Sequence, residues 1–124
     1  MTDNSRYSKI RMINEWYRGD LREDCITLGE AMKLAGYSTY AVGKWHVTNR
    51  RDGIDNRNWP LQRGFDRYYG IIGGAANYFD PSELVRDNRY IKADSDLEYR
   101  PEEYYLTSAI SDHAVQYIEN HAKQ

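Results

Sequence analysis

The chain has 124 residues and a formal net charge of −2 at pH 7. That near-neutral charge gives no support for a nucleic-acid-binding protein, because such proteins usually carry a basic face. No apolar run approaches the roughly 20 residues that a transmembrane helix needs, and the first residues lack the apolar core of a signal peptide. Leu, Ile, Val and Phe make up under a fifth of the chain. So few aliphatic residues predict a segment that packs against something else, although twelve tyrosines and three tryptophans partly compensate.

The first clear element is a helix that begins after residue 26. Thr27 and Glu30 form a capping box, in which each side chain satisfies a free backbone amide of the first helical turn. Gly36 stands where a glycine commonly ends a helix. Helical spacing predicts one buried stripe, made of Leu28, Ala31, Met32 and Ala35.

A strand is predicted over residues 37–42, because that stretch is rich in β-branched and aromatic side chains. A helix that leads into a strand through a tight turn is half of a βαβ unit, which predicts an α/β fold. Lys44 and His46 follow, two residues apart, so we expect their side chains to point to the same side. Two nitrogen donors would then face one small volume, as an anionic oxygen substrate requires. Trp45 would point the other way, into the core.

The middle of the chain shows little periodicity. Residues 48–58 read as a polar loop, and residues 59–81 as a Gly- and aromatic-rich segment that wraps over a scaffold and lines a cleft. Within it, Arg63 and Asp66 are expected to pair and hold a turn at Gly64. The two glycines at 73 and 74 are expected to let the backbone pass close to another element.

The last third of the chain predicts a hairpin, a linker and a helix. Asp87 and Asn88 are a turn-forming pair inside a hairpin arm over residues 84–91. Residues 92–103 look like a charged linker. A helix is expected from about residue 108 to 121, capped by Thr107 or Ser108. Its predicted buried stripe is Ile110, Ala114, Val115 and Ile118.

Four motifs occur in an order that resembles the middle of the catalytic domain of type I sulfatases, the arylsulfatase branch of the alkaline phosphatase superfamily. They are Thr27-Leu28-Gly29-Glu30, Ala35-Gly36-Tyr37-Ser38-Thr39, Gly43-Lys44-Trp45-His46 and Trp59-Pro60-Leu61-Gln62-Arg63-Gly64-Phe65-Asp66. The resemblance covers roughly residues 18–122. It implies part of an alkaline-phosphatase-like sandwich, a mixed sheet flanked by helices that is incomplete in this chain. Residues 1–124 would form one internal segment, without the nucleophile and metal segment and without the C-terminal remainder.

The resemblance also implies the chemistry of a sulfuric ester hydrolase acting on an aryl or carbohydrate sulfate. In that family the lysine equivalent to Lys44 contacts a sulfate oxygen, and the histidine equivalent to His46 hydrogen-bonds the nucleophile. Complete members use Ca²⁺ and a formylglycine made from cysteine, and they are often periplasmic, secreted or lysosomal. Tyr78 and Asp80 are further candidates for lining a substrate pocket.

The chain also departs from the family pattern. Its one cysteine, Cys25, is not part of a Cys-x-Pro-Ser-Arg run, so we interpret it as a structural residue at the entry to the helix. Asp87 and Asn88 cannot supply the six to eight oxygens that calcium prefers, so no metal ligand is assigned. His113 and His121 lack partner motifs and are interpreted as structural. We therefore expect the chain alone to bind neither cofactor and to be inactive.

Two alternatives stay open on the sequence alone. One is a phosphodiesterase or phosphonate hydrolase of the same superfamily. The other is a non-catalytic module that binds sulfated glycans through its tyrosine-rich surface. Nucleic acid and membrane are not expected as partners, whereas self-association that covers exposed core surface is.

Overall fold

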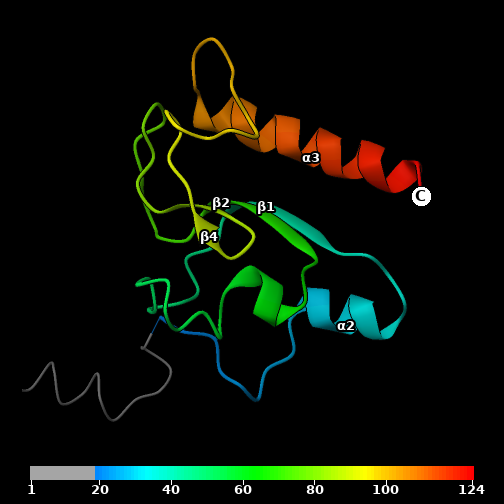
Figure 1. The fold of residues 1–124 in the computed structure, drawn as a ribbon. Helices are drawn as coiled ribbons and strands as arrows, with labels where there is room; N and C mark the ends of the chain where they lie inside the picture. The colour runs from blue at the N-terminus through cyan, green and yellow to red at the C-terminus, as the bar shows by residue number, and fades with distance from the viewer. Residues whose placement is uncertain (1–18) are drawn as a thin grey trace, which may run out of the picture.

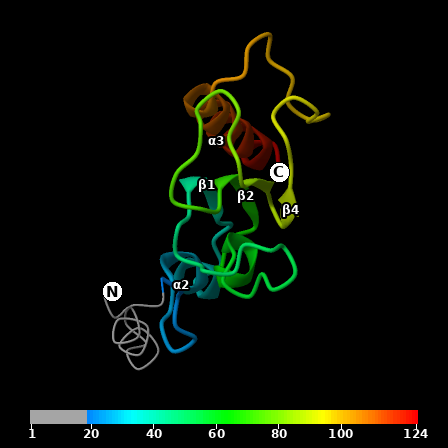
Figure 2. The same ribbon diagram turned by 90° about the vertical axis from the view of Figure 1, so that its left-hand side faces the viewer.

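The computed structural model describes residues 19–124, which form a four-stranded mixed sheet with helices on both faces. β1 and β2 are parallel, and the other neighbouring pairs are antiparallel. In sheet order the strands are β1 (Tyr40–Lys44), β2 (Arg67–Ile71), β3 (Leu84–Arg86) and β4 (Arg89–Tyr90). The helices are α2 (Leu28–Leu34), the short 3₁₀ helix η2 (Pro60–Arg63) and α3 (Leu106–Ala122). Figures 1 and 2 show α3 above the sheet and α2 with η2 below it, which confirms the predicted α/β class.

The capping box of α2 is confirmed. The Thr27 hydroxyl accepts a hydrogen bond from the Glu30 amide at 3.1 Å, and the Glu30 carboxylate accepts one from the Thr27 amide at 2.7 Å. The predicted buried stripe is wrong, because Leu28 is 77% exposed and Met32 is only half-buried. α2 instead approaches the rest of the chain through Gly29, where a Cβ would lie 2.7 Å from the carbonyl oxygen of Gly64.

β1 begins three residues later than predicted, at Tyr40 rather than at residue 37. The reason is a side chain that captures the backbone just before the strand. The Asp66 carboxylate accepts a hydrogen bond from the Thr39 amide at 2.9 Å, and the Asp66 amide donates to the Thr39 carbonyl at 2.7 Å. The residues before Thr39 therefore belong to the turn after α2.

β2 corrects the interpretation of residues 59–81 as an irregular segment. Tyr69 and Ile71 face α3, whereas Tyr68 and Ile72 pack on the other side of the sheet, and all four are buried. A strand covered on both faces does not alternate between polar and apolar residues, so it shows no period of two in the sequence. This is why periodicity did not reveal β2.

The core therefore has two halves, one on each face of the sheet. The half under α3 contains Tyr69, Ile71, Leu84, Leu106, Ala109 and Tyr117. The half on the side of η2 contains Trp59, Tyr68, Ile72 and Val85. No helix in the described range is long and apolar enough to span a membrane.

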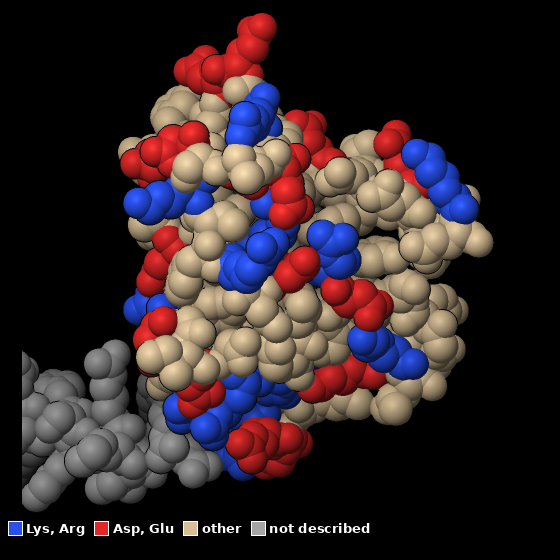
Figure 3. Space-filling model, viewed as in Figure 1, with Lys and Arg blue, Asp and Glu red and all other residues tan. Residues whose placement is uncertain are grey.

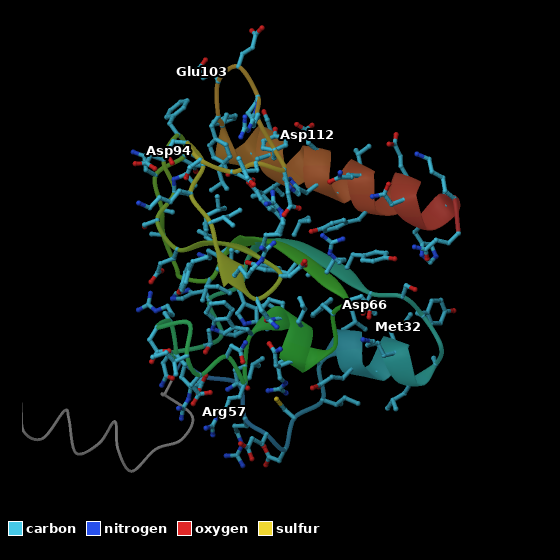
Figure 4. All side chains as sticks on the ribbon, viewed as in Figure 1. Met32, Arg57, Asp66, Asp94, Glu103 and Asp112 are labelled. Carbon is cyan, nitrogen blue, oxygen red and sulfur yellow. The ribbon has the colours of Figure 1, made fainter. Side chains whose placement is uncertain are left out.

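The expected pairing of Arg63 with Asp66 is wrong, although Gly64 does form the turn between them with a φ of 96°. Buried Arg63 binds the capping-box residue Glu30 at 3.0 Å. Asp66 instead pairs with Lys33 of α2 at 2.6 Å, and Figure 4 shows it beside that helix. Both charged groups thus tie α2 to the η2 turn rather than closing the turn on itself.

The segment over residues 92–103 is more than a charged linker. Asp96 accepts two hydrogen bonds from the Arg86 guanidinium, at 2.7 and 2.6 Å, and both side chains are almost fully buried. A bidentate pair of this kind fixes the position of both groups. The segment is therefore anchored to β3.

α3 is longer than predicted and uses a different face. It begins at Leu106 after Tyr105, which makes no side-chain cap, so the proposed caps Thr107 and Ser108 are wrong. Val115 and Ile118, expected in the buried stripe, are 54% and 68% exposed. The buried face consists of Leu106, Ala109, His113 and Tyr117.

Both histidines of α3 have structural partners, as interpreted from the sequence. The His113 ring stacks on the ring of Tyr69, with centroids 3.5 Å apart and planes 7° apart. Its Nδ1 lies 2.7 Å from the carbonyl of Ala109, and its Nε2 lies 3.3 Å from the Arg86 guanidinium. Burial lowers the pKa of His113, so the neutral ring is favoured in the folded chain. His121 lies 3.0 Å from a tyrosine hydroxyl of β1.

Thr27→Ala should destabilise the chain, because it removes the hydroxyl that caps α2 and also donates to the carbonyl of Arg63 at 2.6 Å. We expect a loss of about 1 kcal/mol, which corresponds to a fall in melting temperature of roughly 3–6 °C. Thr27→Ser retains the hydroxyl, so its melting temperature should stay near that of the parent. Equal melting temperatures for the Ala and Ser variants would contradict the capping role.

Asp96→Asn should cost far more, about 3–5 kcal/mol, because it leaves the buried Arg86 charge with only the half-exposed Glu98, 3.6 Å away, as an anionic partner. Arg89→Gln, at an exposed pair, is the matched control and should cost under about 1 kcal/mol.

The same pair makes stability depend on pH. Burial opposes the charge of Asp96, but the hydrogen bonds from Arg86 outweigh it and lower the pKa of Asp96. A lowered carboxyl pKa stabilises the fold above the unfolded pKa, and that stabilisation is lost as the pH falls through the folded pKa. Urea titrations from about pH 5 to about pH 3 should thus show a shallower loss for Asp96→Asn than for the parent.

Candidate functional site

The end of β1 is built around a close approach of two backbones. Gly43 and Gly70 are paired in register, and a Cβ on Gly70 would overlap the carbonyl group of Gly43. The Tyr68 hydroxyl donates to the Gly43 carbonyl at 2.8 Å. Gly43 itself has a φ of 111°, which glycine adopts readily. These contacts hold the strand end in a fixed position just before Lys44.

Lys44 and His46 converge on Gly74, the second residue of the double glycine. The exposed Lys44 ammonium donates to the Gly74 carbonyl at 3.0 Å. The His46 ring lies against the same residue, since a Cβ on Gly74 would be 2.6 Å from its Cε1 and Nε2 atoms. The two nitrogen donors therefore share one small region, as expected from the sequence.

Lys44 and His46 do not come together through the alternation of side chains along one strand. β1 ends at Lys44, and His46 has a left-handed backbone with a φ of 51°. The amides of Trp45 and His46 donate to two consecutive carbonyls, those of Ile71 and Ile72, each at 3.0 Å. Such a conformation is uncommon for a residue other than glycine and often marks a functional site.

Trp45 lies in the core on the η2 side of the sheet, as predicted. Its indole N–H donates to the Asn58 carbonyl at 2.7 Å. Its ring packs edge-on against Phe65 and Tyr68. The indole thus supports the loop before η2 and does not face the Lys44 side.

Arg51 and Glu83 were not identified from the sequence, yet both lie at the double glycine. A Cβ on Gly73 would overlap the Glu83 carboxylate and would lie 3.0 Å from the Arg51 guanidinium. Arg51 and Glu83 pair at 3.2 Å. The close passage of the backbone expected at the two glycines is therefore confirmed, with side chains as the neighbours. The only sequence signal was a basic residue in the polar loop that follows His46.

Tyr78 and Asp80 lie further along the same loop. Tyr78 is 58% exposed and sits with Tyr105, with centroids 5.9 Å apart. The Asn77 side chain accepts from the amides of Phe79 and Asp80 and shapes this turn. Tyr78 contacts the start of α3, where its carbonyl accepts from the Leu106 amide at 2.8 Å, and Asp80 contacts Asn77, so the role of both residues in substrate binding stays a prediction.

The described residues do not fit calcium or a formylglycine precursor. Among residues 19–124 no group of three or more His, Cys, Asp or Glu side chains could hold a metal ion. Asp87 forms the hairpin turn, as interpreted, and its carboxylate accepts from Arg67 and from the Tyr68 amide. Cys25 is exposed, and its thiol donates to a backbone carbonyl at 3.1 Å.

Basic and acidic side chains are interspersed over the face of the molecule in Figure 3, and no large area of one sign covers it. On this face, no broad field of one sign is available to attract a charged ligand.

Gly74→Ala should displace the His46 ring, because the added methyl group would stand 2.6 Å from it. The exposed neighbour Ala75 provides a matched control in Ala75→Ser, which adds an atom without that contact. Imidazole resonances in NMR spectra should shift for His46 in the first variant and stay unchanged in the second. An unchanged His46 resonance in Gly74→Ala would contradict the packing of this site.

The chain is similar in sequence to known sulfatases. The family model named Sulfatase matches residues 1–124. An arylsulfatase from Hemicentrotus pulcherrimus is 32% identical over 126 residues, which covers 94% of this chain and 23% of that protein. An arylsulfatase from Klebsiella aerogenes is 27% identical over 99 residues, covering 77% of this chain and 20% of that protein.

The solved structure of Ps i-CgsB superposes with a TM-score of 0.66 at 24% identity, covering 86% of this chain and 25% of that one. At this identity the superposition shows a shared fold. The chain thus spans about a quarter of the length of the proteins it matches. With a family model that matches its whole length, the chain belongs to the type I sulfatase family.

Proposed function

We propose that this chain supplies the Lys44 and His46 side of the active site of an arylsulfatase-like sulfuric ester hydrolase. The observation that carries the proposal is the convergence of the Lys44 ammonium and the His46 ring on Gly74. It occurs in a chain matched along its length by the sulfatase family, with relatives named arylsulfatase and steryl-sulfatase.

Lys44 is suited to binding a sulfuryl oxygen. Its ammonium donates to a neutral backbone carbonyl, and within residues 19–124 it forms no ion pair. An ammonium group is a compact point charge, so its attraction for an anion is not cancelled by a neighbouring carboxylate. As the ester bond breaks, charge builds on the sulfuryl oxygens, and a fixed cation stabilises the transition state more than the ground state.

His46 is suited to hydrogen bonding or proton transfer beside the same anion. Imidazole can both donate and accept a proton near neutral pH. The left-handed backbone at His46 and the absence of a side chain at Gly74 fix where the ring lies. Fixed placement is what general acid–base catalysis requires of a candidate residue.

The family resemblance implies calcium and formylglycine in a complete member, where they would supply the electrophilic and nucleophilic groups. The described residues offer neither set of ligands, so Lys44 and His46 represent part of an active site. We therefore propose that the isolated chain does not hydrolyse sulfate esters.

A sulfated-glycan-binding module is the second candidate, favoured by one observation. Tyr78, Phe79 and Tyr105 form an exposed aromatic group, with ring centroids 5.9 and 5.6 Å from that of Tyr105. Aromatic rings of this kind offer flat surfaces for a sugar, and Ps i-CgsB has been solved in complex with k-i-k-neocarrahexaose. A phosphodiesterase or phosphonate hydrolase is less well supported, because the named relatives are sulfatases.

The isolated chain should release no sulfate from an aryl sulfate, with or without added calcium. Sulfate release is measured by ion chromatography, with a complete arylsulfatase as the positive control. Turnover that survives purification and disappears in Lys44→Ala would overturn the proposed inactivity.

In a full-length sulfatase that carries this segment, Lys44→Ala should lower kcat and kcat/KM together by roughly 100–1,000-fold, with a smaller change in KM. His46→Ala should cost on the order of 100-fold and flatten one limb of the pH profile. Lys33→Ala, on α2, is the matched control and should change kcat less than about threefold. If Lys44→Ala and His46→Ala both stayed within that range, the active-site role would be untenable.

A further inference from the structure

We propose that Arg51 is a second anion-recognition residue beside Lys44 and His46, and that it selects saccharide sulfates carrying a further anionic group, a second sulfate or a carboxylate. The inference rests on the proposed function, because it assumes that Lys44 receives the first sulfate. It assigns a role to a residue that the sequence motifs do not include.

The first argument is position. The double glycine is contacted from two sides, by His46 at Gly74 and by Arg51 with Glu83 at Gly73. Consecutive Cα atoms are about 3.8 Å apart, so the Arg51 guanidinium lies within roughly 12 Å of the His46 ring. This is the scale that separates two charged groups on one mono- or disaccharide.

The second argument is that Arg51 is held in place while some of its guanidinium donors stay available for another hydrogen bond. Its guanidinium donates to Glu83 at 3.2 Å, and its backbone carbonyl accepts from the Tyr90 hydroxyl at 2.6 Å. The Arg51 side chain is nevertheless 46% exposed. A bond to one carboxylate oxygen uses only part of the donor capacity of a guanidinium group. Donors therefore remain for an incoming anion.

The third argument is backbone strain on both sides of the double glycine. His46 and Glu83 are both left-handed, with φ values of 51° and 56°. Strained residues of this kind cluster at ligand sites, where the surrounding structure holds them. Both side chains fill space that the glycines leave open, so the same backbone segment contacts the His46 ring and the Glu83 carboxylate that pairs with Arg51.

The two cations are suited to different anionic groups of one ligand. The Lys44 ammonium is a point charge suited to one sulfuryl oxygen, whereas the Arg51 guanidinium is a planar fork that matches a sulfate or carboxylate bidentately. Because Glu83 offsets the charge of Arg51, an anion gains from Arg51 only by direct contact. A substrate with one sulfate near Lys44 would gain little, and a substrate with a second anionic group would gain a charge-assisted hydrogen bond.

The test measures the dissociation constants of three probes for the unmodified chain by NMR titration. The probes are inorganic sulfate, a monosulfated disaccharide and the disulfated form of the same disaccharide. The parent should bind the disulfated probe most tightly. Arg51→Gln should weaken that binding about tenfold, the scale of one lost charge-assisted hydrogen bond, and leave the other two probes within about twofold. Tyr90→Phe removes only the bond to the Arg51 backbone carbonyl and leaves the guanidinium paired with Glu83, so this variant should preserve the preference.

Each result either supports or overturns the proposed role of Arg51. The inference is overturned if the parent does not prefer the disulfated probe, if Arg51→Gln has no effect, or if it weakens all three probes equally. Lys44→Ala tests the proposed function separately and should weaken all three. If Lys44→Ala changes nothing while Arg51→Gln still removes the preference, the proposed function fails and the Arg51 contact stands.

Discussion

The parallel pairing of β1 with β2 is the constraint on which the rest of the chain depends. Gly43 and Gly70 allow the two backbones to approach closely at the end of the pair. That register carries β1 to Lys44 and places the chain that leaves β2 directly beside it. The residues after β2 therefore form one wall of the candidate site, and the residues after β1 form the other. A shift of the register by one residue would turn each β1 side chain to the opposite face of the sheet.

Local signals in the sequence predicted the elements that depend on neighbouring residues. The capping box at Thr27 and the turn at Asp87 are set within a few residues, and both are observed. Side-chain partners across long separations were not predictable. The Arg63 guanidinium had an acidic residue three positions away and binds Glu30, 33 positions away, because folding brings that carboxylate to it. β2 was missed for a related reason, since burial on two faces removes the pattern that marks a strand.

The apolar stripes predicted for both helices show that helical periodicity indicates a face suited to burial, not a face that is buried in this chain. Leu28 on α2, and Val115 and Ile118 on α3, occupy helix positions typical of a core but are largely exposed. The chain corresponds to about a quarter of its relatives. The pattern therefore records faces suited to burial, whereas the neighbours that would cover them are not supplied by residues 19–124. Self-association of the isolated chain stays a prediction that follows from these faces. For the candidate site, the motif predicted Lys44 and His46, but Arg51 and Glu83 depended on the three-dimensional arrangement.

The buried pair of Arg86 and Asp96 has a consequence for how the chain opens. Asp96 anchors residues 92–103, Arg86 belongs to β3, and the His113 ring of α3 lies against the same guanidinium. Three segments that are distant in sequence thus share one set of buried contacts, and separating residues 92–103 from β3 would break the ion pair and leave a buried charge without its partner. We expect β3, this segment and α3 to exchange their amide hydrogens as one cooperative unit. α2 is held to the η2 turn by the Glu30–Arg63 and Lys33–Asp66 pairs and by the close approach of Gly29, and it takes no part in the Arg86–Asp96 contacts, so it forms a separate unit that can open first.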